Sequence, residues 1–407
     1  MARDKVKPME KNRHDGKEQS CHAIPFDCIA LLLQGGGALG AYQAGVYQAL
    51  DEAKLCPDWV AGISIGAVNA AIIAGNPPAL RIERLREFWE LVTYDAFKYY
   101  PPSFSSLFTH SDNEHQALNL FSAVHTLNQG VQGFFKPRVP NPWLAEQGSI
   151  AATSFYDSSP LKSTLETLVD FDRINSDSIR LNVCAVNVET GNFVNFDNQA
   201  HKIRVEHILA SGALPPGLPP VEIDGEYFWD GGLISNTPLQ WLIENKSYQD
   251  TLVFQVDLWS ASGEFPQNMA EVLTRQKDIQ YSSRTRANTD RFREQHELRH
   301  NLDRLLKELP EALKTLPEVK KLSKEADSNV YNIVHLIYRN TAYEGYSKDF
   351  EFSRLSMEAH WQKGYADTVK TLKNPKVLER PHNRDGIAIF DMGKEEHNTP
   401  EMKGATA

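Results

Sequence analysis

A serine flanked by two glycines is the residue of this chain best placed for nucleophilic chemistry. Ser64 lies between Gly62 and Gly66 in the sequence GISIG, which has the pattern G-x-S-x-G. In that pattern a sharp strand-to-helix turn exposes the serine hydroxyl, and the glycines leave room for the turn. An apolar run, 59–63, leads into Ser64 and a helical run of small residues, 67–74, follows it. This context, which the motif requires, predicts that Ser64 is a nucleophile.

A second motif is a run of three glycines between an apolar run, 28–33, and a helical pattern over 38–53. Consecutive glycines expose backbone N–H groups, which can stabilise the oxyanion of acyl transfer. A phosphate loop is the rival interpretation, because the spacing also fits G-x-G-x-x-G, yet the chain has no G-x-x-x-x-G-K-[ST]. Because a serine turn follows, we favour an oxyanion-binding loop, made by Gly35, Gly36 and Gly37 with Gly40 as supporting glycine.

A nucleophilic serine also needs a base, which is usually a histidine. Most histidines after Ser64 lie in polar or helical stretches, and His207 and His335 have the surroundings of core residues. Asp230 follows the strand-like segment 227–229 and precedes two glycines, Gly231 and Gly232, which would let Ser64 approach. A carboxylate can act directly as a base where apolar surroundings raise its proton affinity. We therefore predict that Asp230 is the base.

These three elements, in this order, resemble the motifs of the patatin-like phospholipase family: a glycine-rich loop, G-x-S-x-G and D-G-[GA]. The resemblance covers about residues 27–260, including the segments 210–216 and 235–239. It implies a three-layer α/β/α sandwich with a mostly parallel central sheet, and a Ser–Asp dyad made by Ser64 and Asp230. The implied reaction is hydrolysis of lipid esters of the phospholipase A or lysophospholipase type through an acyl-enzyme, with no metal and no cofactor.

Leu39 departs from the family pattern, which often has Arg or Lys at this position of the loop. We therefore expect a weaker oxyanion loop than in relatives.

Two other classes of protein stay open. One is an acyltransferase or thioesterase on the same fold, although those usually have His before the serine, where this chain has Ile63. The other is a non-catalytic lipid-binding protein, which intact motifs disfavour.

Composition changes along the chain predict its organisation. We expect a disordered polar N-terminus, a catalytic domain with an aromatic-rich insertion, a mainly helical C-terminal region and a loose polar tail, at 1–26, 27–265 (insertion 92–150), 266–380 and 381–407. The insertion is either a lid or acyl-chain channel, or packing over one edge of the sheet. Further strands are predicted at 180–188, 193–196, 251–258 and 330–338. A leucine-rich amphipathic helix over 298–313 either docks on the catalytic domain or binds a membrane or partner.

The net charge of −10 argues against nucleic acid as a partner and against attraction to anionic lipid. The expected partner is a lipid or another ester, and any peripheral membrane contact should be local and apolar. The cysteines (Cys21, Cys28, Cys56 and Cys184) have no metal-binding spacing. No secretory signal and no run of about 18 apolar residues is present. The default expectation is a cytoplasmic protein.

Overall fold

The structure is a computed structural model of the chain. It describes residues 24–95, 111–176, 178–237, 239, 249–282, 285–341, 343–383 and 385–391. The predictions made for residues 1–23, for 96–110 of the insertion and for 392–407 of the tail therefore lie outside the described residues.

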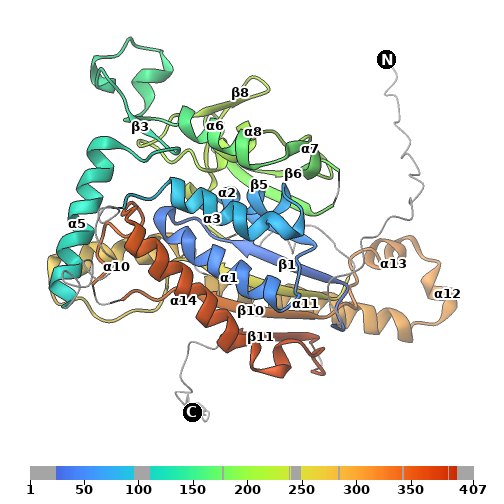
Figure 1. Cartoon of the computed structure of the whole chain (residues 1–407). Helices are drawn as coiled ribbons and strands as arrows, with labels where there is room; N and C mark the ends of the chain where they lie inside the picture. Colours follow the sequence, from blue (N-terminus) through green and yellow to red (C-terminus); the bar gives the residue numbers. More distant parts are fainter. Residues whose placement is uncertain are drawn as a thin grey trace, which may run out of the picture.

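The core of the fold is a nine-stranded sheet with the order β11-β10-β9-β1-β2-β5-β8-β7, in which β6 also pairs with β5. Neighbours from β11 to β5 run parallel, whereas β6, β7 and β8 pair antiparallel (Figure 1). The strands span β1 Cys28–Leu33, β2 Trp59–Gly62, β5 Arg180–Asn187, β6 Phe193–Asp197, β7 Val221–Ile223, β8 Glu226–Asp230, β9 Thr251–Asp257, β10 Tyr331–Ile337 and β11 Ile387–Asp391. A separate ribbon pairs β3 Lys136–Pro137 with β4 Tyr156–Asp157.

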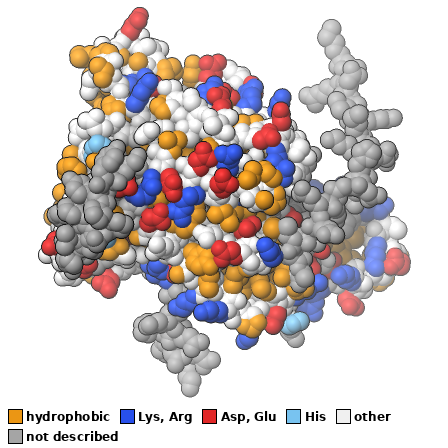
Figure 2. All heavy atoms as spheres, in the orientation of Figure 1, with side chains coloured by type: hydrophobic (Ala, Val, Ile, Leu, Met, Phe, Trp, Pro, Cys, Tyr) orange, Lys and Arg blue, Asp and Glu red, His pale blue; other side chains and the backbone are white. Residues whose placement is uncertain are grey.

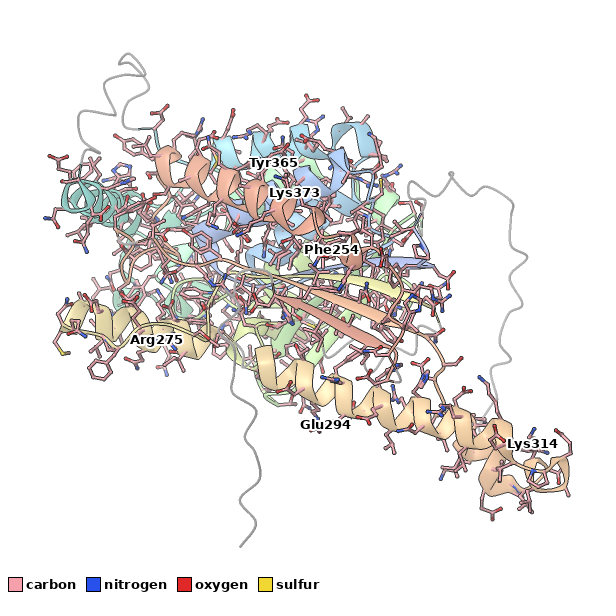
Figure 3. All side chains as sticks on the ribbon, turned by 90° about the horizontal axis from the view of Figure 1, so that it is seen from below. Phe254, Arg275, Glu294, Lys314, Tyr365 and Lys373 are labelled. Atoms are coloured by element: carbon pink, nitrogen blue, oxygen red, sulfur yellow. The ribbon has the colours of Figure 1, made fainter. Side chains whose placement is uncertain are left out.

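Helices cover both faces of the sheet. Alternate side chains of β1 point to opposite sides, so Ile29 packs with helices α1, α2, α3 and α14, while Ala30 packs in the cluster that contains Phe292 of α11. Figures 1 and 3 show α14 and α11 on opposite sides of the sheet. The predicted three-layer α/β/α sandwich with a mostly parallel sheet is thus confirmed.

The helices span α1 Ala41–Glu52, α2 Ile65–Ala74, α3 Arg81–Leu91, α5 Asp112–Gln129, α6 Ser159–Leu168, α7 Phe171–Ile174, α8 Val205–Ser211, α10 Met269–Tyr281, α11 Thr285–Glu308, α12 Glu311–Lys314, α13 Pro317–Leu322 and α14 Arg354–Leu372. Short 3-10 turns occur at η1 Gly37–Gly40, η2 Pro78–Leu80, η3 Pro142–Leu144, η4 Ile150–Thr153, η5 Gly231–Leu233 and η6 Pro375–Val377. Within the described part of the chain, no helix has the length and apolar character needed to cross a bilayer.

The strands predicted from apolar runs are present within a few residues of their expected ends, including β10 at Tyr331–Ile337. Strands β3, β4, β7 and β11 were not predicted, and β11 changes the organisation of the chain most. Ile387–Asp391 forms β11, parallel to β10, inside the segment 381–407 that composition predicted to be a loose tail. The strand is short, and only Ile387 of its side chains joins the buried cluster beneath the sheet. Strands from both sides of residue 265 therefore lie in one sheet.

The helix predicted over 298–313 is divided between the end of α11 and α12, which begins after Pro310, and α11 docks on the sheet through residues before this segment. Phe292 of α11 is buried beneath the sheet, whereas Leu298 and Leu305 are 72% and 60% exposed. Figure 3 shows this helix running out from the sheet toward Lys314. The amphipathic leucine pattern therefore does not mark the docked face, contrary to the docking interpretation.

The insertion contains a helix that its weak periodicity did not predict. Helix α5 begins with a capping box, in which the Ser111 hydroxyl accepts from the Glu114 N–H at 3.3 Å and the Glu114 carboxylate accepts from the Ser111 N–H at 3.2 Å. Such reciprocal bonds satisfy two otherwise unpaired amides at a helix start. The sequence Ser-Asp-Asn-Glu was the local signal for this helix.

Helices α1 and α14 cross at two glycines. A Cβ atom on Gly45 would overlap the carbonyl oxygen of Trp361, and one on Gly364 would overlap that of Tyr42. The two backbones are therefore in direct contact, which ties the C-terminal helix to the N-terminal half of the sheet.

This contact predicts that Gly364→Ala destabilises the protein. Alanine is the better helix former by about 1 kcal/mol, so any net loss must come from the overlap with Tyr42. We expect the free energy of unfolding, measured with urea, to fall by about 1–3 kcal/mol. Gly345→Ala is the matched control, because a Cβ there meets nothing within 4 Å. Equal or greater stability in Gly364→Ala would contradict the close crossing.

Candidate active site

Ser64 lies on a strained turn between β2 and α2. Its backbone has φ 55° and ψ −126°, a region that residues with a side chain rarely adopt. The Ser64 N–H donates to the carbonyl oxygen and the hydroxyl of Ser211, at 3.1 Å and 3.2 Å. The segment 210–216, which contains Ser211, therefore stabilises the turn. Ser64 immediately precedes α2, so its hydroxyl lies at the N-terminal end of this helix.

The two motif glycines are required by close backbone contacts. A Cβ on Gly62 would overlap the backbone of Gly66, and a Cβ on Gly66 would overlap the carbonyl oxygen of Leu33. The turn can therefore close only with glycine on both sides of Ser64, as the motif predicted.

Asp230 ends β8 and is fully buried. Its carboxylate accepts hydrogen bonds from the Ser64 hydroxyl and from the Gly232 N–H, the latter at 2.7 Å. Its own N–H donates to the carbonyl oxygen of Ala213 at 3.0 Å, in the segment that also holds Ser64. The structure thus brings together two residues that are 166 positions apart in the sequence.

Burial sets the proton affinity of this carboxylate. Loss of water raises the pKa of Asp230 to about 7, although the hydrogen bonds from Gly232 and Ser64 act in the opposite direction. An aspartate with an ordinary pKa is a weak base, so the shift brings Asp230 into the range useful for proton transfer near neutral pH.

The glycine loop packs directly against Ser64. A Cβ on Gly35 would lie 2.9 Å from the Cβ of Ser64. The Gly35 N–H is not available, because it donates to the side-chain oxygen of Asn236 at 3.1 Å. Within the described residues, the N–H groups of Gly36 and Gly37 have no hydrogen-bond acceptor. Of the three amides expected to bind an oxyanion, these two remain free to do so.

Hydrogen bonds from and to buried polar side chains fix the backbone of this loop and the residues next to it. The Asn236 amide group also donates to the Gly35 carbonyl oxygen at 3.0 Å, and the Trp259 indole donates to the same oxygen at 2.8 Å. Gln34 accepts from the N–H groups of Leu258 and Trp259 at 2.6 Å and 3.1 Å. The resemblance included the segment 235–239 but did not single out Asn236, and no sequence pattern marks Trp259.

Leu39, where the resemblance led us to expect Arg or Lys, is fully buried in the apolar core. The loop therefore presents backbone donors and no charged side chain of its own.

Ser64 and Asp230 line a cavity of about 250 Å3, and the walls of this cavity are mainly apolar. The insertion supplies Leu127, Phe134 and Phe135, and the C-terminal region supplies Phe350 and Phe352. The ring centroids of Phe134 and Phe352 lie 5.9 Å apart. The insertion and the C-terminal region, which are far apart in the sequence, thus form one apolar wall of the cavity that Ser64 lines.

No histidine of the described residues lines this cavity. His207 is buried, and its Nδ1 accepts from the Arg204 N–H at 2.9 Å. His335 lies on β10, 3.7 Å from the carboxylate of Asp257. Both are thus placed in the core, as their sequence surroundings predicted. The part of the chain that the structure describes also has no cluster of His, Cys, Asp or Glu suited to hold a metal ion.

Comparison with known proteins identifies relatives. A family model described as Patatin-like phospholipase matches residues 31–243, and a model described as Patatin phospholipase matches 279–384. Lysophospholipase NTE1 of Yarrowia lipolytica is 23% identical over 60% of this chain and 14% of its own length. Patatin-like phospholipase domain-containing protein 6 of Mus musculus is 35% identical over 21% of this chain and 6% of its own length. The matched region is thus a small part of these relatives.

Among solved structures, VipD from Legionella pneumophila is 16% identical with a TM-score of 0.38, over 85% of this chain and 67% of that chain. Human GIVD cytosolic phospholipase A2 is 16% identical with a TM-score of 0.22, over 42% of this chain and 22% of that chain. These scores are too low to establish a shared fold, whereas the first family model spans more than half of the sequence. The chain therefore belongs to the patatin-like phospholipase family, which confirms the resemblance of its three motifs.

Proposed function

We propose that this chain hydrolyses carboxylic esters of lipids, with Ser64 as the nucleophile and Asp230 as the base. One observation carries the proposal: the hydroxyl of a serine on a strained turn donates to a buried carboxylate at the wall of an apolar cavity. The raised pKa of Asp230 supports its role as a proton acceptor near neutral pH.

The reaction proceeds in two steps. Asp230 takes the Ser64 proton while the oxygen of Ser64 attacks the ester carbonyl, and the Gly36 and Gly37 amides stabilise the oxyanion. The proton passes to the leaving alcohol as the ester C–O bond breaks, which leaves an acyl-enzyme. Water then gives a proton to Asp230 and attacks the acyl carbon. The free acid leaves, and the proton returns to Ser64.

The apolar cavity supports an acyl chain as the group that binds beside Ser64. Its walls of Phe, Leu and Tyr side chains offer contacts to hydrocarbon and few to a headgroup. The insertion therefore acts as an acyl-channel wall. Because one relative is a lysophospholipase, we favour a lysophospholipid or a phospholipid as the substrate class.

Exposed apolar side chains on α5, on the loop between β3 and β4 and on α10, which supply or adjoin cavity residues in the sequence, support peripheral contact with a lipid surface. Leu127 lines the cavity and is itself 49% exposed. Phe155 precedes the cavity residue Tyr156, and Ile279 lies two residues before the cavity residue Tyr281; both are also exposed. We call this set of exposed apolar residues the apolar rim; it comprises Leu120, Phe121, Val124, Leu127, Val139, Trp143, Leu144, Phe155 and Ile279.

The rim suits a zwitterionic rather than an anionic surface. Helix α5, which carries much of the rim, contains no Lys or Arg. Figure 2 shows hydrophobic side chains at the upper left, over the loop between β3 and β4, where Val139, Trp143 and Leu144 are 93%, 85% and 78% exposed. Binding should therefore come from apolar insertion and depend little on salt.

The dyad predicts that Ser64→Ala and Asp230→Asn each lower kcat by about a thousandfold or more, because nucleophile and base act as a unit. Hydrolysis of p-nitrophenyl butyrate and of a lysophospholipid panel measures the loss. In the wild type, kcat/KM should fall below about pH 7, where Asp230 becomes protonated.

Two controls belong with this assay. Glu308→Gln, which changes an exposed acid at the end of α11 and outside the cavity, should leave kcat unchanged, and excess chelator should do the same. Near-full activity in Asp230→Asn would refute the dyad. Transfer of the acyl group to an added alcohol in preference to water would favour an acyltransferase.

Burial of Asp230 also predicts a pH-dependent loss of stability. Its pKa is raised in the folded state, so the folded protein binds the proton more tightly than the unfolded chain, and stability falls as pH rises from about 4 to about 7. Asp230→Asn removes this penalty. The gain in free energy of unfolding should be larger at pH 8.5 than at pH 5.5 by on the order of 2 kcal/mol. An equal gain at both pH values would contradict the raised pKa.

The apolar rim predicts binding to phosphatidylcholine vesicles, measured by cosedimentation with the Ser64→Ala protein so that lipid is not consumed. Phe121→Ser and Trp143→Ser should each weaken binding roughly tenfold, the effect of removing one large apolar side chain from the interface. Leu298→Ser with Leu305→Ser on α11 is the matched control and should bind like the parent. Equal losses in both sets, or binding that needs anionic lipid, would refute the rim.

A further inference from the structure

Residues from the C-terminal region hold the glycine loop that lies beside Ser64. The Ala38 N–H donates to the carbonyl oxygen of Asp349 at 2.8 Å. Gly37 has φ +56°, and a Cβ there would overlap the same carbonyl oxygen. The backbone of Gly37 and Ala38 thus lies directly against the carbonyl oxygen of Asp349. A shift of the Asp349 backbone would therefore also shift the N–H group of Gly37.

Asp349 is in turn held by an ion pair with α10. Its carboxylate lies 2.5 Å from the ammonium group of Lys277, and these side chains are 19% and 11% exposed. Lys277 also donates to the carbonyl oxygen of Tyr346 at 3.2 Å, and its ammonium lies 4.3 Å from the ring centroid of Tyr346. Several independent contacts thus fix the position of this lysine.

A second ion pair reinforces the first. Asp278, the next residue of α10, pairs with Lys348 at 2.5 Å, so two Lys-Asp dipeptides pair reciprocally. Lys348 also donates to the side chain of Asn340 at 2.6 Å. The pair is largely shielded from water, with side chains 1% and 9% exposed. Shielded pairs of this kind fix geometry, because separating them leaves an uncompensated charge.

The same helix holds the other end of the glycine loop. The carbonyl oxygen of Tyr281, the last residue of α10, accepts from Asn236 at 3.0 Å and from Gln34 at 3.3 Å. Asn236 makes the two hydrogen bonds that fix Gly35. Arg275 anchors the middle of α10 to the carbonyl oxygen of Ser260 at 3.1 Å (Figure 3 labels Arg275). Helix α10 therefore reaches both ends of the loop.

We propose that the Lys277–Asp349 ion pair is a positioning pair that holds the glycine loop in its oxyanion-binding geometry. The pair is electrically neutral, so it does not replace the cation that is missing at Leu39. It fixes the backbone donors instead, and it gives a role in the site to residues beyond 31–243, the region that the first family model matches. The kinetic part of this inference rests on the proposed function.

The test uses full-length Lys277→Met and Asp349→Asn. A loop amide displaced by a fraction of an ångström stabilises an oxyanion poorly while ground-state binding persists. We expect kcat for p-nitrophenyl butyrate to fall by about tenfold to a hundredfold, with KM changed less than about threefold. Lys277→Arg, which keeps the charge, should restore most of kcat. Lys363→Met, from an exposed Lys363–Asp367 pair on α14, is the matched control and should leave kcat unchanged.

Hydrogen–deuterium exchange gives a readout independent of activity. The hydrogen-bonded amides of Ala38 and Leu39 should exchange faster in Lys277→Met and Asp349→Asn than in the wild type, and at the wild-type rate in Lys363→Met. Unchanged exchange in both variants would overturn the positioning pair even if the protein is an active esterase. Faster exchange in a chain that hydrolyses no ester would refute the proposed function and support the positioning pair. If Lys277→Met does not fold, Asp349→Asn provides the same comparison.

Discussion

The strained backbone at Ser64 is the constraint on which the rest of the site depends. A serine at φ 55° costs on the order of 1–3 kcal/mol and persists only where its surroundings leave no alternative. Here β2 fixes one side, α2 begins on the other, and Ser211 binds the Ser64 N–H. The glycines at 62 and 66 allow these parts to approach closely enough to hold the turn.

The buried carboxylate of Asp230 makes a second unfavourable contribution to the stability of the folded protein, close to the strained backbone of Ser64. A fully buried carboxylate is destabilising in its ionised form, and this one has two hydrogen-bond donors and, among the residues that the structure describes, no cation as partner. The scaffold must therefore supply the missing stability through its large apolar core on both faces of the sheet. A site of this kind is expected in a large domain, because only an extensive core tolerates two adjacent unfavourable features.

Local motifs predicted which residues the structure brings together around the cavity, because each motif is built from residues adjacent in the sequence. The turn at Ser64, the glycine loop and Asp230 all follow this rule, and their strands were predicted from apolar runs. The contacts that orient them were not predictable in the same way. Asn236 and Trp259 reach the loop from positions more than 200 residues away, and an ordinary Asn or Trp has no spacing that reveals such a contact.

The errors in the fold have physical causes of the same kind. Strand β11 is five residues long and is stabilised by pairing with β10, so composition alone could not separate it from a tail. The leucine stripe of α11 was misleading because amphipathic periodicity reports a helix and not what covers its face. Leu298 stays exposed, while the buried contact comes from Phe292, outside the stripe.

Leu39 connects these observations. A leucine buried in the core gives the loop packing energy in place of a charge, so in the proposed reaction the stabilisation of an oxyanion would depend on how well the backbone donors are placed. Placement in turn depends on partners from distant segments, Asn236 at one end of the loop and Asp349 at the other. Residues beyond the three motifs therefore fix the backbone of Gly35 and Gly37, in a loop that has no cation of its own.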